Sequence, residues 1–445
     1  MKYFYIVFCL FLSLSVEVQA QVSKKYGVVN LEGEVLVPFI YEEITPFENG
    51  YARTMRRERY GLIDISGKEI IPAQQYHDMG KVDAGMIIVM RNKLYGVIDT
   101  ENRILVPLEY KNILPLANNH FLVYKTITSG VVNSNGELTV PLSNSILMPF
   151  SGDRNYLLSN DMYRQQSKVI DTENREVAFE QNSSIRDFGN GYLGLRQSKP
   201  NTYKVVDIHG KEICSGLTVQ ENQRFTGDYL RYHDQGKLGL MNIRGEAVLP
   251  PVYSRIFDFN NGYAKVVQDS TRFGDNQIGM VDEQGRVIVR CMYDGLGEPS
   301  DDRIMAFAVQ KHGYLDLKGR VAIPFNYDSA TDFKDHMAIV SKDNLYGVID
   351  TGGRQVLPFE YRQLRYLGNS LFAASRQLKW GIIDSSGREI IPFTYDSVGE
   401  IYNDRYITVQ KNQKWGVINL LEYEVLPFIY KSIVDYSDGV FIVTK

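Results

Sequence analysis

The chain has 445 residues, with 49 Lys+Arg against 53 Asp+Glu, which gives a formal net charge of −4. Binding to nucleic acid displaces counterions with a basic stripe, so this balance argues against nucleic acid as the main ligand. Apolar residues make up 44% of the chain, which excludes wholesale disorder. The 30 Tyr and 37 Gly, against only 15 Pro, favour β structure with many tight turns.

Residues 1–20 are expected to be a signal peptide. Met1-Lys2 is followed by an apolar run from Phe4 to Leu14 and by Val18-Gln19-Ala20, a suitable cleavage sequence. The run is too short to span a bilayer, which takes about 20 apolar residues. No other window is long and apolar enough, so we expect no transmembrane segment in the mature chain. The pattern predicts export to the periplasm, the cell surface or the medium.

The remaining sequence, residues 21–445, is an array of twelve copies of one unit about 35 residues long. The clearest units begin with an aromatic residue, a Gly, two aliphatic residues and an Asp or Asn, and two worn copies, at 168–171 and 203–207, lack the Gly. No linker or second domain is left over, and residues 130–239 hold the most degenerate copies. The structural repeat anchors of the clearest copies are Tyr26, Gly27, Tyr60, Gly61, Tyr95, Gly96, Tyr346, Gly347, Trp380, Gly381, Trp415 and Gly416.

Three further columns recur in step with the anchors. A Pro such as Pro72 follows the anchor Gly by eleven residues, a Tyr such as Tyr76 comes a few residues later, and a Gly such as Gly67 follows the anchor by six. Together with Lys379–Asp384 (Lys-Trp-Gly-Ile-Ile-Asp), these columns resemble the WG-repeat family. The resemblance covers the whole mature chain and implies bacterial β-rich repeats without established catalytic residues.

The columns predict short antiparallel strands. The stretch after Gly61 is apolar on successive positions, so this strand is expected to be covered on both faces. A type I turn is expected at Asp64–Gly67, and likewise at Asp350–Gly353 and Asp384–Gly387. Pro72 is expected to end the return strand. Each unit should therefore hold three or four short strands, and the fold class is all-β.

Units of this size must stack on their neighbours, because three strands cannot bury both faces alone. The chain enters the pattern at the second strand of a unit and leaves after the third, so the last strand could complete the first unit. Two arrangements stay open: an open, superhelical, solenoid-like array and a closed propeller-like ring. We favour the open array, because a four-stranded propeller blade usually takes about 40 residues or more.

Candidate sites each have a structural interpretation that we favour. The turn Asp and Asn residues lack the alternating oxygen ligands of a calcium loop. The Tyr column and the two Trp, Trp380 and Trp415, are interpreted as interior rings. The cluster Arg53, Arg56, Arg57 and Arg59 is interpreted as a solvated strand face. Neither the six His nor the Cys have metal-ligand spacing. We therefore expect no catalytic residue, cofactor or metal, while Cys214 and Cys291 could be bonded to each other or free.

The sequence predicts an exported bacterial protein that acts as a non-catalytic binding or interaction scaffold. Its expected partner is a protein or a cell-envelope glycan. Two alternatives are a carbohydrate-active hydrolase or lyase on a β-repeat fold, and a purely structural component of the envelope.

Overall fold

The computed structural model describes residues 24–445 except 162–165, 178–183, 220–223 and 270–275. Within these residues the chain forms 48 strands in twelve four-stranded antiparallel sheets, and no helix. The all-β prediction is therefore confirmed. The expected signal peptide, residues 1–20, lies outside the described residues. None of the described segments is a helix with the length and apolarity needed to cross a membrane.

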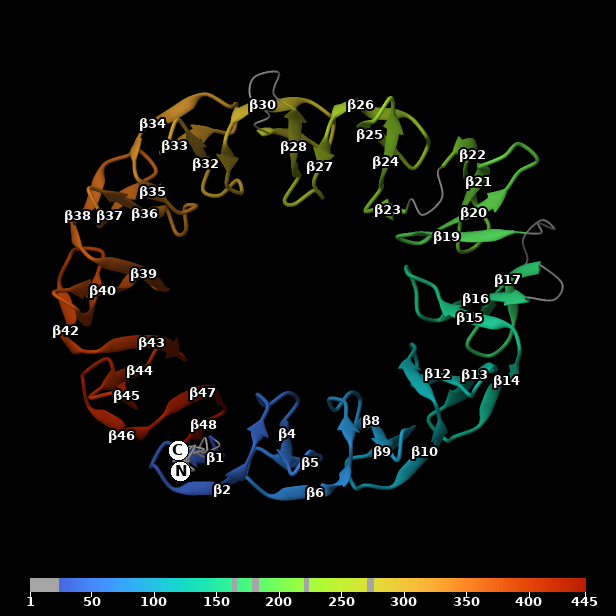
Figure 1. Cartoon of the computed structure of the whole chain (residues 1–445), viewed down its shortest axis with the longest axis horizontal. Helices are drawn as coiled ribbons and strands as arrows, with labels where there is room; N and C mark the ends of the chain where they lie inside the picture. The colour runs from blue at the N-terminus through green and yellow to red at the C-terminus, as the bar shows by residue number, and fades with distance from the viewer. Residues whose placement is uncertain (1–23, 162–165, 178–183, 220–223, 270–275) are drawn as a thin grey trace, which may run out of the picture.

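The twelve sheets stand side by side in a ring, and we number them in chain order from the sheet that holds both chain ends (Figure 1). Each sheet is a meander whose first strand lies nearest the centre of the ring and whose fourth strand lies at the outer rim. The first strands, from sheet 1 to sheet 12, are β47 (Ser432–Ser437), β3 (Glu43–Ile44), β7 (Asp78–Met79), β11 (Asn112–Pro115), β15 (Ile146–Pro149), β19 (Ile185–Gly189), β23 (Phe225–Thr226), β27 (Arg255–Ile256), β31 (Gly295–Leu296), β35 (Ser329–Ala330), β39 (Gln363–Gly368) and β43 (Ser397–Tyr402). The second strands are β48 (Val440–Thr444), β4 (Tyr51–Arg56), β8 (Met86–Arg91), β12 (His120–Tyr124), β16 (Tyr156–Asp161), β20 (Tyr192–Arg196), β24 (Tyr229–Asp234), β28 (Tyr263–Asp269), β32 (Arg303–Ala308), β36 (Met337–Lys342), β40 (Leu371–Arg376) and β44 (Tyr406–Lys411).

The third and fourth strands of each sheet carry the repeat columns. The third strands, in the same order, are β1 (Tyr26–Asn30), β5 (Arg59–Asp64), β9 (Leu94–Asp99), β13 (Ser129–Asn133), β17 (Gln166–Asp171), β21 (Thr202–Asp207), β25 (Lys237–Asn242), β29 (Asn276–Asp282), β33 (Lys311–Asp316), β37 (Leu345–Asp350), β41 (Lys379–Asp384) and β45 (Lys414–Asn419). The fourth strands are β2 (Val35–Tyr41), β6 (Glu69–Tyr76), β10 (Ile104–Tyr110), β14 (Leu138–Ser143), β18 (Glu176–Val177), β22 (Glu212–Thr218), β26 (Ala247–Tyr253), β30 (Val287–Tyr293), β34 (Val321–Tyr327), β38 (Gln355–Tyr361), β42 (Glu389–Tyr395) and β46 (Glu424–Tyr430).

The ring is closed by strands from the two ends of the chain. Sheet 1 has the order β2-β1-β48-β47, and β1 pairs with β48 from Tyr26↔Thr444 to Asn30↔Val440. Backbone hydrogen bonds between Lys25 and Lys445 extend this pairing. The closed ring was the alternative arrangement, and our preference for an open array was wrong. Closure leaves neither end of the array with an uncovered sheet.

The open array was favoured because a unit of about 35 residues looked too short for a propeller blade. The unit is short because the first strand of many sheets is short. In six sheets it has two residues, as in β3 and β7. A single residue, such as Glu42 or His77, joins a fourth strand to the next first strand. A four-stranded sheet therefore fits into about 35 residues, below the usual length of a propeller blade.

The sequence unit and the sheet are out of phase by two strands. The unit that begins at Tyr26 contributes the third and fourth strands of sheet 1 and then the first and second strands of sheet 2. Each unit thus belongs to two neighbouring sheets. Every boundary between sheets is consequently bridged by a continuous stretch of one repeat, and ring closure repeats the same arrangement with the chain ends.

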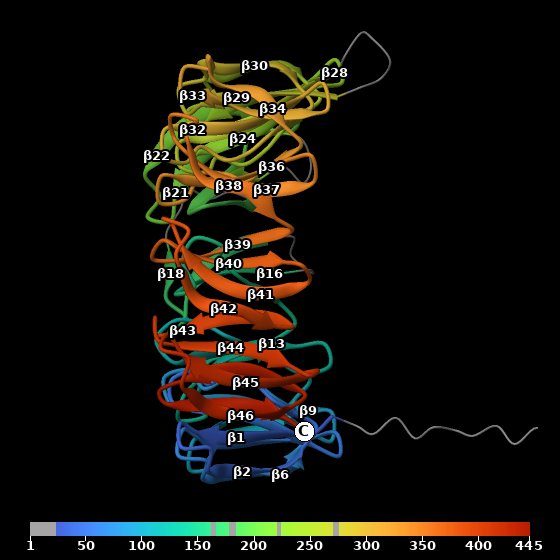
Figure 2. The ribbon, with the colours of Figure 1, turned by 90° about the vertical axis from the view of Figure 1, so that its left-hand side faces the viewer.

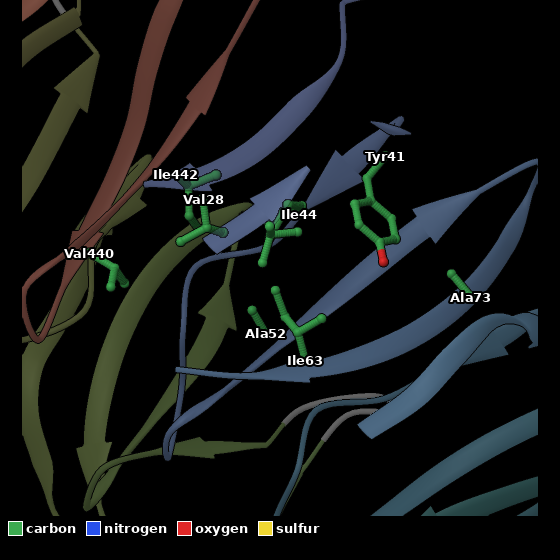
Figure 3. Close-up of a cluster of buried hydrophobic side chains, with 9 residues drawn as sticks. Val28, Tyr41, Ile44, Ala52, Ile63, Ala73, Val440 and Ile442 are labelled. Atoms are coloured by element: carbon green, nitrogen blue, oxygen red, sulfur yellow. The ribbon is translucent and has the colours of Figure 1, made fainter. Parts of the chain in front are cut away.

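The hydrophobic core is divided into layers between neighbouring sheets. Figure 3 shows one such layer, in which Val28 and Ile442 of sheet 1 face Ile44 and Ile63 of sheet 2. The next residue of the same strand, Val29, belongs to the layer between sheets 12 and 1. Because successive residues of a strand point to opposite faces, both faces of each third strand are buried, as the sequence predicted.

The strands run across the thickness of the ring, as the edge view in Figure 2 shows. Hairpins between second and third strands therefore end at one face, which we call the tip face. The loops between first and second strands and the turns between third and fourth strands end at the opposite face, the turn face. The C-terminus lies at the tip face.

Candidate functional site

The anchor Gly residues lie where the fourth strand approaches the third most closely. A Cβ on Gly61 would lie 2.4 Å from the carbonyl oxygen of Ile71, and one on Gly96 would lie 2.7 Å from that of Val106. The register shifts at this point, because the fourth strand carries extra residues opposite the Gly. Pro72 lies inside β6 at this bulge, so the expectation that it ends the strand was wrong. A Pro here removes a donor from the outer edge of the sheet and blunts it against strand addition.

The anchor rings lie opposite the Tyr column. Tyr26, Tyr60, Tyr95, Tyr346, Trp380 and Trp415 are half-buried, and each pairs across the sheet with the column Tyr of the fourth strand. The column Tyr are buried, and their hydroxyls reach the next sheet: Tyr395 donates to Glu422 at 3.1 Å. Burial, together with Glu422, raises the pKa of Tyr395 to about 12. These rings therefore tie sheets together.

The turns after the third strands are stabilised by side-chain oxygens that accept hydrogen bonds from the turn's own backbone. The backbone N–H of Gly67 donates to the carbonyl of Asp64 at 2.9 Å, and Asp64 Oδ1 accepts from the N–H of Ser66 and Lys68. The bonds Gly353 N–H to Asp350 and Gly387 N–H to Asp384 place the other two predicted turns. The carboxylates are thus used by their own turns.

A residue four positions after the turn Asp or Asn completes the arrangement, and sequence reasoning missed it. In six turns that begin with Asp, an Arg donates its Nε–H to the carboxylate, and in three turns that begin with Asn, the amide donates to a Glu. The Arg bonds, together with those from the backbone, lower the pKa of Asp350 against the opposing effect of its burial. The pairs are Asp99–Arg103, Asp171–Arg175, Asp282–Arg286, Asp316–Arg320, Asp350–Arg354, Asp384–Arg388, Asn30–Glu34, Asn133–Glu137 and Asn242–Glu246.

Long polar side chains also cover the inner edge of the next sheet. Arg53 donates to the carbonyl of Met79 at 2.6 Å, and Tyr124 donates to the carbonyl of Leu147 at 3.2 Å. In both cases the acceptor is the buried residue of a first strand. Arg53 therefore has a structural role within the sheet. The other members of the Arg cluster, Arg56, Arg57 and Arg59, lie at the tip face.

Three hollows stand apart from this regular frame, and their lining residues all fall between 80 and 224. A polar hollow of about 360 Å³ opens on the turn face between sheets 4 and 5. An apolar hollow of about 210 Å³ opens between sheets 3 and 4. A third, of about 280 Å³, lies between β15 and β19 and is flanked by Arg186 and Arg224. The sequence had marked residues 130–239 as the part where the repeat relaxes.

His120 is shared by the polar and apolar hollows. It opens β12 and is buried, with 8% of its surface exposed. Its Nδ1 lies 2.8 Å from the carbonyl of Asn118 and its Nε2 lies 3.0 Å from Glu173 Oε1. His120 thus connects sheet 4 to the turn of sheet 5.

Polar side chains from two sheets converge on the polar hollow. Asn118 donates to the Asn155 side-chain carbonyl at 2.7 Å, and Asp153 accepts from both the backbone and the side chain of Asn155. Asp171, Glu173, Arg175 and Tyr156 complete the lining. The hollow offers amide, carboxylate, guanidinium and phenol groups within one concavity, which suits a ligand rich in hydroxyls.

The apolar hollow is lined by backbone and aliphatic groups of sheet 3 and by the loop before β12. Its walls include Ile87, Ile88, Leu116 and Phe121, with Gly80 at its edge. Sheets 5 and 8 place a larger residue where sheet 3 has Gly80, namely Met148 and Phe257, whereas sheet 9 also has a Gly there, Gly297. The small residue leaves room for an apolar group next to the polar hollow.

No group of three His, Cys, Asp or Glu suited to a metal ion occurs among the described residues. Cys214 and Cys291 are free thiols in sheets 6 and 8, and burial raises the pKa of each. The Cys291 side chain packs over the anchor Gly279, a place taken by Phe39 in sheet 1 and Leu108 in sheet 3.

The sequence profile described as "WG containing repeat" matches nine segments: 26–57, 60–95, 95–125, 239–271, 278–311, 313–346, 346–375, 380–415 and 415–445. The chain belongs to the WG-repeat family. The matches stop between residues 126 and 238, which includes sheets 5 and 6, although these sheets keep four strands each. The sheet 4 side of the polar hollow, with Asn118 and His120, thus lies in a matched segment of this WG-repeat chain, and the sheet 5 side, from Asp153 to Arg175, lies outside the matches.

No curated protein matches the chain. Among solved structures, it is similar to a eukaryotic initiation factor at 8% identity and a TM-score of 0.36, covering 85% of this chain and 95% of the other. It is also similar to Hsv2 of Kluyvelomyces marxianus at 10% identity and a TM-score of 0.24, covering 55% of this chain and 95% of the other. Scores at this level carry no inference about function.

Proposed function

We propose that this WG-repeat ring is a non-catalytic binding scaffold of the bacterial envelope, and that the polar hollow at His120 binds a glycan. The observation that carries the proposal is the junction of a polar and an apolar hollow at one side chain, His120, next to the part of the ring that the repeat profile does not match. Sugars present hydroxyls on their edges and apolar patches on their faces, so adjoining polar and apolar walls suit them.

The state of one lining carboxylate, Asp171, supports binding over hydrolysis. Although burial alone would raise it, the pKa of Asp171 is lowered by bonds from Arg175 and from the backbone of Glu173. A general acid for glycoside hydrolysis needs a raised pKa. Asp171 is instead held as a charged acceptor that shapes its own turn.

Export to the envelope is part of the proposal and rests on the pattern of residues 1–20. Cleavage after Ala20 leaves Gln21 as the first residue. Mass spectrometry of the N-terminus of the native protein tests this. A native chain that keeps Met1 would contradict export.

Binding is tested by calorimetric titration of the purified protein with a panel of envelope glycan fragments. We expect Asn118→Ala and Glu173→Gln to weaken binding about tenfold, since each removes one or two hydrogen-bonding groups. The matched control is Asn49→Ala, because Asn49 holds the same loop position in sheet 2. Equal effects of Asn118→Ala and Asn49→Ala would contradict the proposed site.

The hydrolase alternative is tested in the same samples by following new reducing ends. Turnover that Glu173→Gln abolishes would replace the scaffold proposal with the enzymatic alternative. Failure of every glycan to bind would remove the glycan and leave a protein partner to be sought.

A further inference from the structure

The charges of the ring are divided between its two faces, although the whole chain has a formal net charge of only −4. The hairpins of the tip face, counted from the residue pair that closes each described hairpin, are predominantly basic. Their acidic side chains are Glu58, Asp234 and Asp343. Their basic side chains are Lys24, Lys25, Arg56, Arg57, Arg59, Arg91, Lys93, Lys125, Arg196, Lys199, Lys237, Lys311, Lys342, Arg376, Lys379, Lys411, Lys414 and Lys445.

The turn face has the opposite character, because the described turns there begin with Asp or Asn and several of them carry further acids. Asp282-Glu283 and Asp171 with Glu173 illustrate this. In the first-to-second-strand loops, Asp301 and Asp302 lie at the same face. The polarity follows from the meander, since one end of every strand is used by acidic turns and the other by short hairpins.

Some basic residues of the tip face are neutralised by carboxylates behind the tips. Lys25 pairs with Glu42, Lys125 with Glu109, Lys237 with Asp269, Lys311 with Asp328, Lys379 with Asp396, and Arg376 with Glu360 and Glu389.

In an arc from sheet 12 through sheet 1 to sheet 3, Lys25 is the one described basic side chain of the tip face with such a partner. Among the described residues, the other basic side chains there have no carboxylate within ion-pair distance. We call this group the basic arc, and it consists of Lys411, Lys414, Lys431, Lys445, Lys24, Arg56, Arg57, Arg59, Arg91, Lys93 and Lys111.

The most exposed aliphatic side chains among the described residues also lie on the tip face. Val309 is 88% exposed, Leu378 is 83% exposed and Ile127 is 78% exposed. Val309 and Leu378 occupy left-handed positions in two-residue hairpins, with φ of 50° and 68°, where Asn or Gly is the usual choice. Ile127 on sheet 4 and Leu378 on sheet 11 lie just beyond the two ends of the basic arc.

We propose that the tip face docks on an anionic lipid bilayer. The basic arc supplies attraction to the headgroups, and the apolar tips, Ile127 and Leu378, enter the boundary between headgroups and acyl chains. Charge alone would suit any polyanion. The exposed aliphatic tips at both ends of the arc favour a ligand that is anionic at its surface and apolar beneath it, which describes a bilayer.

The test is co-sedimentation of the purified full chain with vesicles of equimolar phosphatidylcholine and phosphatidylglycerol, compared with phosphatidylcholine alone. We expect binding to the anionic vesicles only, weakened by salt, because exposed charges are screened. The variant Arg57→Gln, Lys93→Gln, Lys411→Gln and Lys414→Gln should lower the partition coefficient about tenfold or more.

A matched variant removes the same charge from the turn face: Lys68→Gln, Lys211→Gln, Arg244→Gln and Lys318→Gln, all at exposed positions. It should bind as the unchanged protein does. Equal loss in the two variants would show that only total charge matters and would overturn the assignment of a face.

The apolar part is tested by Ile127→Ser with Leu378→Asn, against Leu421→Ser as a control, because Leu421 is 76% exposed on the turn face. We expect a several-fold loss for the pair and none for the control. Circular dichroism confirms that each variant keeps its fold. Equal binding to both vesicle types, or none, overturns the proposal. The proposal is also overturned if Ile127→Ser with Leu378→Asn leaves binding unchanged and a soluble polyanion abolishes it. That result would indicate a polyanionic partner instead.

Discussion

Closure of the ring can be tested at Phe441, which has no exposed surface and lies in β48, next to the N-terminal strand β1. Its ring packs 4.7 Å from that of Tyr436 and pairs across the sheet with Val29. Replacing a buried Phe by Ala costs about 3–5 kcal/mol through lost burial and a cavity. We expect Phe441→Ala to destabilise sheet 1 by about 4 kcal/mol, which raises local opening about a thousandfold.

Hydrogen exchange followed by mass spectrometry measures this opening strand by strand. In a closed ring, Phe441→Ala should speed exchange of the amides of β1 and β2, which are distant in sequence. The matched control is Phe372→Ala, since Phe372 holds the same position of β40 in sheet 11 and is 1% exposed. It should leave β1 unaffected. Unchanged exchange of β1 in Phe441→Ala would refute closure by β1 and β48 and restore the open array.

Three further predictions concern single turns and are all measured by urea unfolding. Asp282→Asn and Arg286→Glu should each destabilise the protein, whereas the double variant recreates the Asn–Glu pair of other turns. We therefore expect a coupling free energy of about 0.5–1 kcal/mol between the two changes. Additive effects of the two changes would contradict the pairing. Val309→Asn should stabilise the protein by about 1 kcal/mol, because Asn accepts a φ of 50° better than a β-branched residue; a lower midpoint would contradict this. Bonds from the backbone and side chain of Arg320 lower the pKa of Asp316 to about 2. The ionised Asp316 therefore adds to the stability of the fold above pH ~4, and this stabilisation is lost as the pH falls toward ~2. In Asp316→Asn, the urea midpoint should depend less on pH over that range.

The repeat and its local structure could be predicted from the sequence because they depend on neighbouring residues. The turn at Asp64–Gly67 needs only an acceptor side chain and a Gly at φ +84°. Burial of both faces of β5 follows from its continuous apolar run. Such features repeat in every copy, so each copy reinforces the interpretation of the others.

Ring closure could not be predicted in the same way. It depends on the small rotation between neighbouring sheets, summed over the whole array, and on the two-residue first strands such as β3. The total rotation cannot be inferred from any single residue. The pairing of Tyr26 with Thr444 is decided by the packing of all the sheets between them.

The site was missed for a different reason. His120 looked like one of six scattered His, because its partner Glu173 lies in the next sheet, 53 residues away. The residue four positions after the turn Asp could have been found, since Asp pairs with Arg and Asn with Glu in separate copies. Charge polarity could have been found too, once second-to-third-strand hairpins were assigned to one face.

The two proposed surfaces can act at the same time, because they lie at opposite ends of the strands. The polar hollow is lined by residues that precede β16 and follow β17, at the turn face. The apolar tip of sheet 4, Ile127, lies at the other end of β12 and β13, strands of five residues each, a separation of about 17 Å. A ring docked on a bilayer by its tip face would therefore present the hollow to the solvent side. Lipid binding should leave the affinity of the hollow for its ligand unchanged, and a ligand titration on docked protein would detect any competition between the two surfaces.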